Sequence, residues 1–233
     1  MVDLHYLPES GFVASGDSGP QRDSPQNWVV WHFTHKDNLQ RIVDNDALYP
    51  STMKTPPVNV ANSDIKERRA AIRVRPDDTY PAATVADHVP PFYIAAKSPM
   101  LFAVSMGHAE YRGGTGDLVF LGAVLGDIAS SGLTWCVSNG NAAASFTEFS
   151  RQLPALGSFV DFPLLQQRYW NNIPEDMNRK SRRAAELLVL GPVPLRLISV
   201  VAAKTQPVLT RAQAQMGTVG GVRQYCEFPQ IYY

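Results

Sequence analysis

The 233-residue chain lacks the features that mark membrane, exported and disulfide-bonded proteins. No apolar run reaches the ~20 residues that a membrane-spanning helix needs. The first residues, Met-Val-Asp-Leu-His-Tyr, have neither the basic start nor the apolar core of an export signal. The chain has only two cysteines, Cys136 and Cys226, far apart in sequence. We therefore expect a cytoplasmic protein with free thiols and no membrane partner.

Familiar nucleotide and metal motifs are also missing. No Gly-x-Gly-x-x-Gly follows an apolar strand and no P-loop is present, so neither a dehydrogenase nor a phosphate-loop nucleotide enzyme is indicated. His32 and His35 lie three residues apart, a spacing that puts them on opposite faces of a strand. No cysteine or carboxylate pair with ligand spacing accompanies them. We expect no metal.

The chain has no excess of positive or negative charge, because 21 basic residues balance 21 acidic ones. A protein that coats nucleic acid without regard to sequence is usually strongly basic. Two local clusters stand out, one of six basic against two acidic residues over 54–75, the other just before Glu186. The second comprises Arg179, Lys180, Arg182 and Arg183. Such clusters are either solvated faces or a local groove for phosphates, and charge alone leaves both interpretations open.

The hydropathy pattern predicts one α+β domain over residues 28–233, with many short strands and helices on the outside. Residues 1–27, rich in Gly, Ser, Pro and Asp, predict an irregular N-terminal arm. Asp37 with Gln40 predicts a capping box for a helix that ends near 45–46. Strands are predicted at 28–34, 91–94, 100–106, 118–125, 186–190 and 197–202, and near the C-terminus; further helices at 64–73, 141–153 and 164–170.

Three polar residues occupy unusual places in this pattern. His32 ends an apolar strand, Arg69 lies in a basic, exposed helix, and Glu186 heads the apolar run Leu187-Leu188-Val189-Leu190. A carboxylate is a poor choice at the start of a buried strand if stability alone is at stake. From spacing alone, however, structural roles for all three residues are favoured over functional ones.

Six short segments, in order and with compatible spacing, resemble the DarT family of DNA ADP-ribosyltransferase toxins from about residue 28 to 233. They are Trp31-His32-Phe33-Thr34-His35 with Asp37-Asn38-Leu39, Lys66-Glu67-Arg68-Arg69, His88-Val89-Pro90, Phe92-Tyr93-Ile94, Ser98-Pro99-Met100-Leu101 and Arg183-Ala184-Ala185-Glu186-Leu187-Leu188-Val189, followed by a closing Tyr232-Tyr233. The resemblance implies an ADP-ribosyltransferase fold. That fold is a split β-sandwich holding NAD+ in its cleft, with peripheral helices and a long NAD-binding loop.

The resemblance also implies roles for individual residues. Glu186 is the implied catalytic residue, together with Arg69, and the segment from about 54 to 71 is the implied NAD-binding loop. The implied NAD+ contacts are His32, Phe33, Thr34, Arg41, Tyr49, Arg69 and Tyr93. The implied contacts to the acceptor are Arg69, Arg75, Arg179 and Arg182, with the substrate loop at about 138–183. The chain departs from the family at Arg41, where a small residue is usual, and by one added proline at Pro91.

These residues suit transfer of ADP-ribose from NAD+ to a base. Loss of nicotinamide builds positive charge on the ribose, and a preorganised charge such as Glu186 is worth ~3–4 kcal/mol there. A guanidinium holds its proton firmly, so Arg69 is interpreted first as an electrostatic clamp and as a proton acceptor only if strongly perturbed. The implied acceptor is thymine in single-stranded DNA, because pairing masks the ring nitrogen in a duplex.

Alternatives remain at the acceptor. Guanine, RNA or protein are other acceptors for the same enzyme, and a non-catalytic nucleic-acid-binding relative is a third hypothesis. Trp170 and Tyr169 are either stacking platforms for a base or, in the favoured interpretation of Trp170, part of the core. The resemblance further implies a toxin that blocks replication and a macrodomain antitoxin of the DarG type as its partner.

Overall fold

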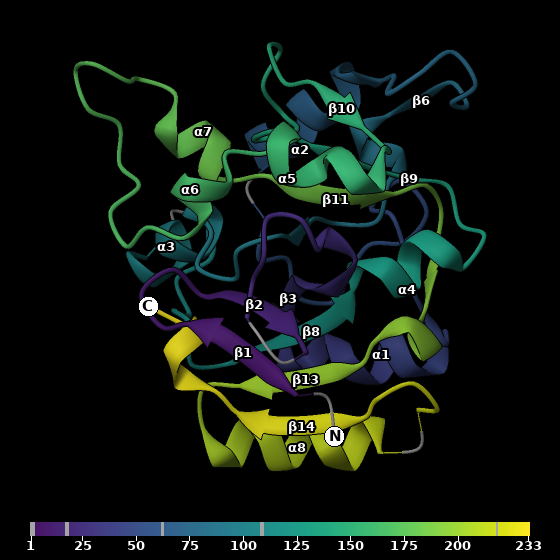
Figure 1. Ribbon diagram of the computed structural model, residues 1–233. Coiled ribbons are helices and arrows are strands. Elements are labelled where there is room, and N and C mark those ends of the chain that lie inside the picture. The colour runs from purple at the N-terminus through teal and green to yellow at the C-terminus, as the bar shows by residue number, and fades with distance from the viewer. Residues whose placement is uncertain (1–2, 17–18, 62, 108–109, 218) are drawn as a thin grey trace.

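A computed structural model describes residues 3–16, 19–61, 63–107, 110–217 and 219–233. Its main feature is a ten-stranded mixed sheet, counted over those ranges, with the path β10-β9-β11-β7-β3-β8-β13-β14 and the pair β1–β2 joined to β3 (Figure 1). The strands of this sheet are β1 (Leu4–Leu7), β2 (Phe12–Ser15), β3 (Trp28–His35), β7 (Phe92–Tyr93), β8 (Leu118–Val124), β9 (Trp135–Ser138), β10 (Phe149–Ser150), β11 (Glu186–Val189), β13 (Val200–Ala203) and β14 (Gln224–Glu227). Two small pairs lie outside it, β4 (Ala47–Leu48) with β12 (Val193–Pro194), and β5 (Arg73–Val74) with β6 (Ala83–Thr84).

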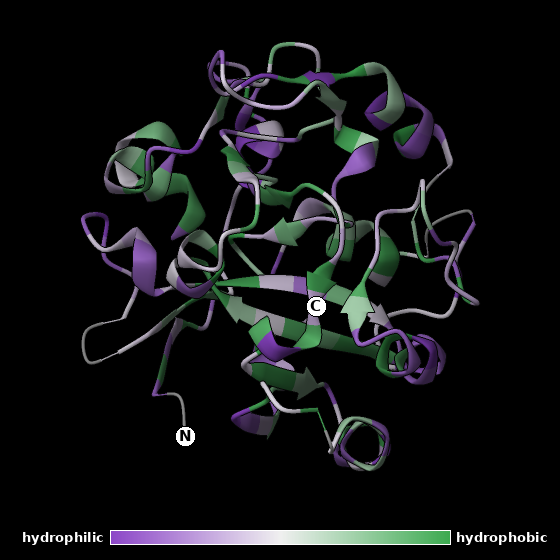
Figure 2. Ribbon diagram, turned by 90° about the vertical axis from the view of Figure 1, so that its right-hand side faces the viewer, coloured by the Kyte–Doolittle hydropathy of each residue, from purple (hydrophilic) through white to green (hydrophobic). Residues whose placement is uncertain are grey.

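Strand β3 is the centre of the sheet, and all eight of its residues are buried. Its aromatic and β-branched residues suit a strand covered on both faces. Trp28 and Val30 enter one apolar cluster, whereas Val29 and Trp31 enter a second cluster on the opposite face. Figure 2 shows these inner strands as largely hydrophobic and the outer helices and loops as more polar.

The sheet is narrowest between β3 and β7, where a single residue pair, Trp31 with Tyr93, joins its two parts. On its other side β3 pairs with β8 over seven residues. The predicted α+β class is confirmed. In place of the expected split sandwich, the strands form one continuous sheet whose two parts meet at this narrow junction, and a cavity lies beside the junction.

Helices surround the sheet: α1 (Leu39–Asp44), α2 (Ser63–Ala71), α3 (Pro99–Ser105), α4 (Leu125–Ser130), α5 (Leu156–Phe159), α6 (Phe162–Leu165), α7 (Arg179–Arg183) and α8 (Gln206–Met216). The connection from β13 to its parallel neighbour β14 runs through α8, which packs against both strands at the bottom of Figure 1. Helix α8 was not predicted, although Val208, Leu209, Ala212 and Met216 bury one of its faces at helical spacing.

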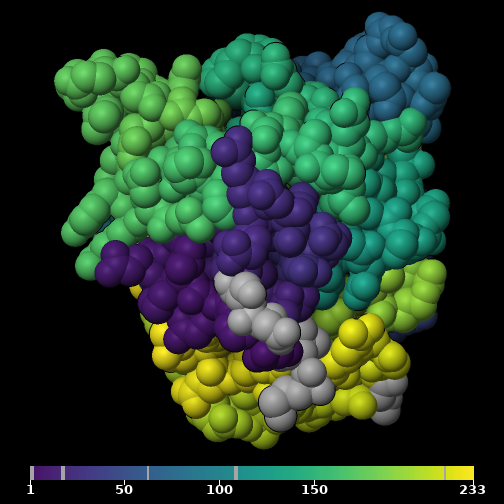
Figure 3. Space-filling view, in the orientation of Figure 1, coloured from purple at the N-terminus to yellow at the C-terminus, as the bar shows by residue number. Residues whose placement is uncertain are grey.

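The prediction of an irregular arm at residues 1–27 was wrong for its described part. Strands β1 and β2 form a hairpin, and β2 pairs with β3, so that Phe12 and Val13 are fully buried. Gly11 adopts φ of 64°, which a glycine tolerates best, and allows the tight connection. In Figure 3 this hairpin lies across the molecule between the green and the yellow parts of the chain. Gly- and Ser-rich flanks hid two strands of only four residues each.

Other local predictions were also wrong. Residues 100–106 form helix α3, because Ser98 accepts a hydrogen bond from Leu101 N as its N-cap and Pro99 occupies the first turn. Residues 141–153 form turns and β10, and the helix predicted at 164–170 is the shorter α6. The predicted capping box of Asp37 is absent, since the ring of His35 accepts from Asp37 N instead. Helix α1 ends at Asp44 with Asn45 as its C-cap, close to the predicted end near 45–46.

Within the described ranges, no helix is long and apolar enough to cross a membrane. The same residues contain no cluster of His, Cys, Asp or Glu that could hold a metal ion. Cys136 and Cys226 are free thiols, as predicted.

Candidate active site

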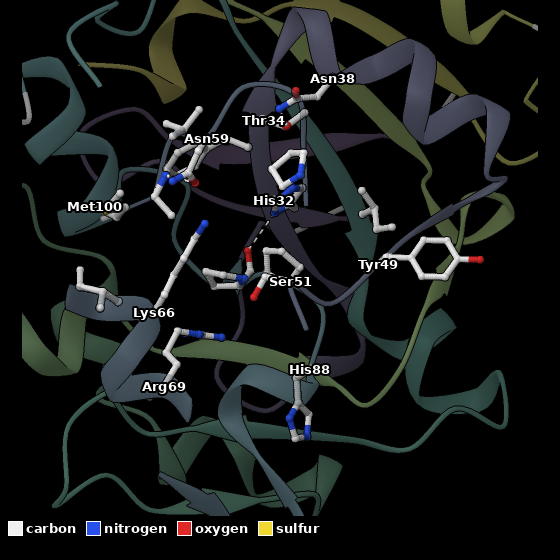
Figure 4. Close-up of a pocket in the computed structure, with 18 of the residues that line it drawn as sticks. His32, Thr34, Asn38, Tyr49, Ser51, Asn59, Lys66, Arg69, His88 and Met100 are labelled. Carbon is white, nitrogen blue, oxygen red and sulfur yellow. Dashed lines mark hydrogen bonds between the residues drawn. The ribbon is translucent and has the colours of Figure 1, made fainter. Parts of the chain in front are cut away.

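A cavity of about 340 Å³ lies beside the junction of β3 and β7. Its volume falls in the range of small-molecule sites. The walls come from β3, α1, the segment between β4 and α2, α2 itself and the start of β11 (Figure 4). The cavity is bordered by Glu186 and by every residue implied above as an NAD+ contact, namely His32, Phe33, Thr34, Arg41, Tyr49, Arg69 and Tyr93.

Glu186 and Arg69 form a buried ion pair in this cavity. Arg69 Nη1 donates to Glu186 Oε1 at 3.1 Å and to Oε2 at 3.0 Å, and Ala142 N donates to Oε1 at 3.1 Å. The side chains of Glu186 and Arg69 are 2% and 11% exposed. The pairing of Glu186 with Tyr93 and a hydrogen bond from Glu186 N to Ser138 Oγ fix the carboxylate's backbone. Burying two charges has a desolvation cost that apolar side chains in the same place would avoid. This cost favours a functional reason for the presence of the pair.

One terminal nitrogen of the Arg69 guanidinium is unused. Its Nη2 is buried and has no hydrogen-bond partner among the residues that the structure describes. Buried donors are rarely left unpaired in native proteins. Figure 4 shows the side chain rising from α2 toward the middle of the cavity. Nη2 can therefore donate to an oxygen of a bound ligand.

The ring of His32 is neutral and has a defined tautomer. Burial lowers the pKa of His32 to about 4, so the ring is uncharged at pH 7. Nδ1 lies 3.4 Å from Pro91 O, and because a carbonyl only accepts, Nδ1 carries the proton. Nε2 is then an acceptor, suited to a sugar hydroxyl. His32 lies in the middle of β3, not at the strand end that the sequence predicted.

Phe33 and Tyr93 form an aromatic wall of the cavity. Their rings stack with centroids 6.1 Å apart and planes 17° apart. Burial, reinforced by the nearby Glu186 carboxylate, raises the pKa of the Tyr93 hydroxyl well above its usual value. Tyr93 therefore stays protonated, and the added proline at Pro91 has not removed it from the cavity.

Arg75, Arg179 and Arg182, three of the four arginines implied as DNA contacts, do not border the cavity. Arg75 pairs with Asp78 at 2.6 Å on the surface. Arg179 Nη2 donates to Gln167 Oε1 and Tyr169 O, and Arg182 pairs with Asp161 and Asp176. Of these implied DNA contacts only Arg69 borders the cavity, whose other cations include Lys66 and Lys180. Those two lysines lie within the basic clusters identified in the sequence.

Trp170 and Tyr169, two aromatic residues of the implied substrate loop, differ in their exposure to solvent. Trp170 is 5% exposed, and its Nε1 donates to Tyr233 Oη, so it is a packed residue as favoured above. Tyr169 is 73% exposed. Only Tyr169 of the two presents a face to solvent.

Arg183, three residues before Glu186, is fully buried. Its guanidinium donates to five backbone carbonyls, those of Ser10, Lys97, Leu164, Leu165 and Gln167. Burial lowers the pKa of Arg183 to about 10, so it remains charged at pH 7. Arg183 was quoted in a basic cluster and in the segment that includes Glu186, but its burial was not predicted, because nothing in the sequence distinguishes a buried cation from its exposed neighbours.

Two further polar residues at the cavity were quoted only as parts of motifs. His88 is buried, donates from Nδ1 to Thr84 O at 2.8 Å and accepts at Nε2 from Tyr80 Oη at 2.9 Å. Burial lowers its pKa to about 4, and Figure 4 shows its ring pointing away from the other labelled side chains. Asn38, 2% exposed, bonds to both Thr34 and Val58. The sequence feature that could have identified Asn38 is its position at the N-terminus of α1, within the quoted motif Asp37-Asn38-Leu39.

Comparison with known proteins agrees with this geometry. The family profile described as "ssDNA thymidine ADP-ribosyltransferase, DarT" matches residues 31–233. A DNA ADP-ribosyl transferase of Mycobacterium tuberculosis is 53% identical over 228 residues, covering 98% of each chain.

Two solved structures are similar in fold. DarT of Thermus sp. 2.9 in complex with ADP-ribosylated single-stranded DNA matches with a TM-score of 0.79 and 28% identity, covering 88% of this chain and 96% of that one. The same Thermus protein in complex with NAD+ matches with a TM-score of 0.72 and 27% identity, covering 92% and 99%.

Proposed function

Because the chain belongs to the DarT family of single-stranded DNA thymidine ADP-ribosyltransferases, we propose that it transfers ADP-ribose from NAD+ to thymine in single-stranded DNA, with Glu186 as the central catalytic residue. The observation that carries the proposal is the buried pair of Glu186 with Arg69 at the cavity. The family and its NAD-dependent activity follow from the comparisons, and the roles of individual residues are our inference.

NAD+ fits the chemistry of this cavity. The aromatic wall of Phe33 and Tyr93 suits a flat ring, and the acceptor Nε2 of His32 suits a ribose hydroxyl. The unpaired Nη2 of Arg69 requires an acceptor oxygen, which phosphate or carbonyl groups provide. Arg41 and Tyr49 complete the proposed contacts at the exit of α1.

In the overall reaction the bond from ribose C1′ to the nicotinamide nitrogen breaks, a bond from C1′ to a thymine ring nitrogen forms, and neutral nicotinamide and one proton are released. The carboxylate of Glu186 stabilises the positive charge that develops on the ribose. It is held in place by three hydrogen bonds before reaction begins, so little reorganisation is needed.

Arg69 acts as a clamp in this proposal. Nη1 orients the carboxylate, while the positive charge of the guanidinium favours loss of the thymine ring proton. A guanidinium is an electrostatic partner more readily than a proton acceptor. The proton is therefore assigned to solvent, with direct transfer to Arg69 as the alternative.

Single-stranded DNA reaches the cavity across its basic edge. Lys66 and Lys180 border the cavity, while Arg75, which follows β5, and Arg179 and Arg182, which lie in α7 of the implied substrate loop, are outside it. Cations so placed can follow phosphates leading to a base in the cavity. Thymine must be unpaired for its ring nitrogen to react, so we propose single-stranded DNA over duplex.

We further propose that the protein is a cytoplasmic toxin, since NAD+ and replicating DNA meet there. A bulky adduct on a template base blocks replication. The matching partner is a macrodomain antitoxin of the DarG type that removes ADP-ribose. Expression of the chain alone should arrest growth, and growth should be restored by co-expression of such a macrodomain or by Glu186→Ala.

The direct test is incubation of the purified chain with NAD+ and a thymine-containing single-stranded oligonucleotide. We expect one added ADP-ribose by mass, no adduct on the same oligonucleotide with every thymine replaced by cytosine, and none on the duplex. Transfer to guanine, RNA or protein instead would reassign the acceptor. Full NAD+ turnover in Glu186→Ala would remove Glu186 from the chemistry, and no NAD+ turnover in the wild type would favour a non-catalytic nucleic-acid-binding protein.

A further inference from the structure

Asn38 stands at the N-terminus of α1, where asparagine side chains usually cap the helix. Here its side chain makes no capping bond. It is 2% exposed and is directed instead toward the segment between β4 and α2. Such a departure from local preference indicates that another requirement fixes the residue.

The amide of Asn38 uses all of its polar groups. Nδ2 donates to Thr34 Oγ1 at 2.9 Å and to Val58 O at 2.9 Å, and Oδ1 accepts from Val58 N at 2.8 Å. The reversed amide would face like groups at both Val58 atoms, so its orientation is unambiguous. Asn38 thus pairs with the Val58 backbone as a neighbouring strand would.

The pairing with Val58 matters because residues 55–61 form a wall of the cavity. Among the residues that the structure describes, the backbone of this segment bonds to the rest of the protein only through Val58 and Asn38. Val60 adds an apolar anchor, since it is 8% exposed and belongs to the second core cluster. Pro56 and Pro57 have no N–H to contribute.

The bond to Thr34 matters because it sets the direction of a hydroxyl. Thr34 Oγ1 accepts from Asn38, so its own hydrogen must point elsewhere. No other described group takes that hydrogen, and Thr34 borders the cavity. Figure 4 shows Asn38 and Thr34 side by side above His32. The Thr34 hydroxyl is therefore arranged as a donor toward a ligand in the cavity.

We propose that Asn38 is a positioning residue for the NAD+ site, acting through Thr34 and Val58 without touching the ligand. This inference rests on the proposed function only in the identity of the ligand. One amide aims the Thr34 hydroxyl at an acceptor oxygen of NAD+ and holds the 55–61 wall at the distance that the ligand needs.

The test is calorimetric binding of NAD+ in the absence of DNA, followed by steady-state transfer to DNA. Asn38→Ala should weaken NAD+ binding about tenfold, as expected for one misdirected hydrogen bond, and should raise KM for NAD+ with kcat within about threefold of wild type. Hydrogen exchange at residues 55–61 should accelerate. Asn27→Ala, at an exposed asparagine that does not border the cavity, is the matched control.

Variants at Thr34 separate positioning from mere support of the fold. Thr34→Ser should bind NAD+ like the wild type, and Thr34→Val should weaken binding about tenfold. In the Asn38→Ala background the effect of Thr34→Val should shrink to about threefold or less, because the hydroxyl is no longer directed. Asn38→Asp, which keeps size but lacks both donors, should behave like Asn38→Ala and serves if the alanine variant does not fold.

Unchanged NAD+ binding in both Asn38 variants, or full additivity with Thr34→Val and unchanged exchange at 55–61, overturns the inference and leaves the proposed function intact. If NAD+ binding responds to the Asn38 and Thr34 variants as expected, but the wild type transfers ADP-ribose to no DNA, the proposed acceptor is overturned instead. A wild-type protein that does not bind NAD+ overturns both.

Discussion

Replacement of Glu186 by glutamine tests the central chemical claim with the smallest change of shape. The amide keeps the size of the side chain and can still accept from Arg69 Nη1 and Ala142 N through one oxygen. What it removes is the negative charge beside the cavity. A preorganised charge or hydrogen bond at the reacting centre contributes ~3–4 kcal/mol, so kcat should fall about 10²- to 10³-fold.

The same substitution has a stability cost that must be separated from the chemical one. Arg69, whose side chain is 11% exposed, loses its charged partner and keeps a neutral one. Loss of a charge-assisted hydrogen bond costs about 2 kcal/mol. For a chain of this size that corresponds to a decrease in Tm of roughly 4–8 °C. Typical domains have about 5–15 kcal/mol of stability, so Glu186→Gln should remain folded at 25 °C.

The assay is single-turnover transfer to a thymine-containing oligonucleotide, with thermal unfolding and NAD+ binding measured on the same preparation. Glu227→Gln is the matched control, because Glu227 is exposed on β14 and does not border the cavity. A folded Glu186→Gln protein that transfers ADP-ribose within tenfold of the wild-type rate would falsify the assignment of Glu186. A defect confined to NAD+ binding would make it a binding residue only.

Three further predictions concern two buried histidines, the buried Arg183, and two arginines outside the cavity. The pKa values of His32 and His88 are lowered to about 4, so the unfolded chain binds more protons than the folded one between pH 6.5 and 4, and stability falls as pH decreases through that window. Urea unfolding at pH 5 should show a loss of ~2 kcal/mol per histidine relative to pH 7, and a flat profile would contradict the buried neutral rings. Arg183→Met should lower the free energy of unfolding by at least ~3 kcal/mol, measured by urea titration, because five carbonyls lose their donor; a decrease of less than about 1 kcal/mol would refute its bonding role. Arg75→Ala and Arg179→Ala should each leave NAD+ binding unchanged and reduce the salt dependence of oligonucleotide binding by ~0.7 for each phosphate that is no longer neutralised, whereas unchanged slopes would remove these residues from the DNA path.

The sequence predicted those parts of the fold in which local pattern and final environment agree. The buried strand around Trp31, the strand begun by Glu186 and the helix carrying Arg69 were placed correctly. Residues 100–106 resemble a strand in their apolar content, but the Ser98 cap and Pro99 mark the start of helix α3 (Pro99–Ser105). The N-terminal hairpin was missed because its stability comes from pairing with β3, a long-range interaction that no local pattern displays.

Sequence resemblance indicated which residues gather at the cavity and which roles to expect of them, but not the contacts that they make there. The ion pair of Arg69 with Glu186 joins residues far apart in the chain, and its unused Nη2 is visible only in three dimensions. Asn38 was part of a quoted motif, yet its bonds to Val58 depend on the path of a loop that hydropathy cannot predict. Arg179 and Arg182 were indistinguishable by charge from Arg183, which the structure buries.

The five carbonyls around Arg183 have a consequence for the order in which the chain can become active. They come from the first hairpin, from the residues before α3 and from the α6 region, and the hydrogen bond to Ser10 closes a loop of most of the chain. Such a long-range bond forms late in folding, because its closure entropy must be offset by structure already in place. The strand that starts three residues later carries Glu186, the carboxylate that we propose as catalytic. We therefore expect that removal of the N-terminal hairpin disturbs the seating of Glu186, so that NAD+ consumption should require the hairpin and the strand begun by Glu186 in one folded chain.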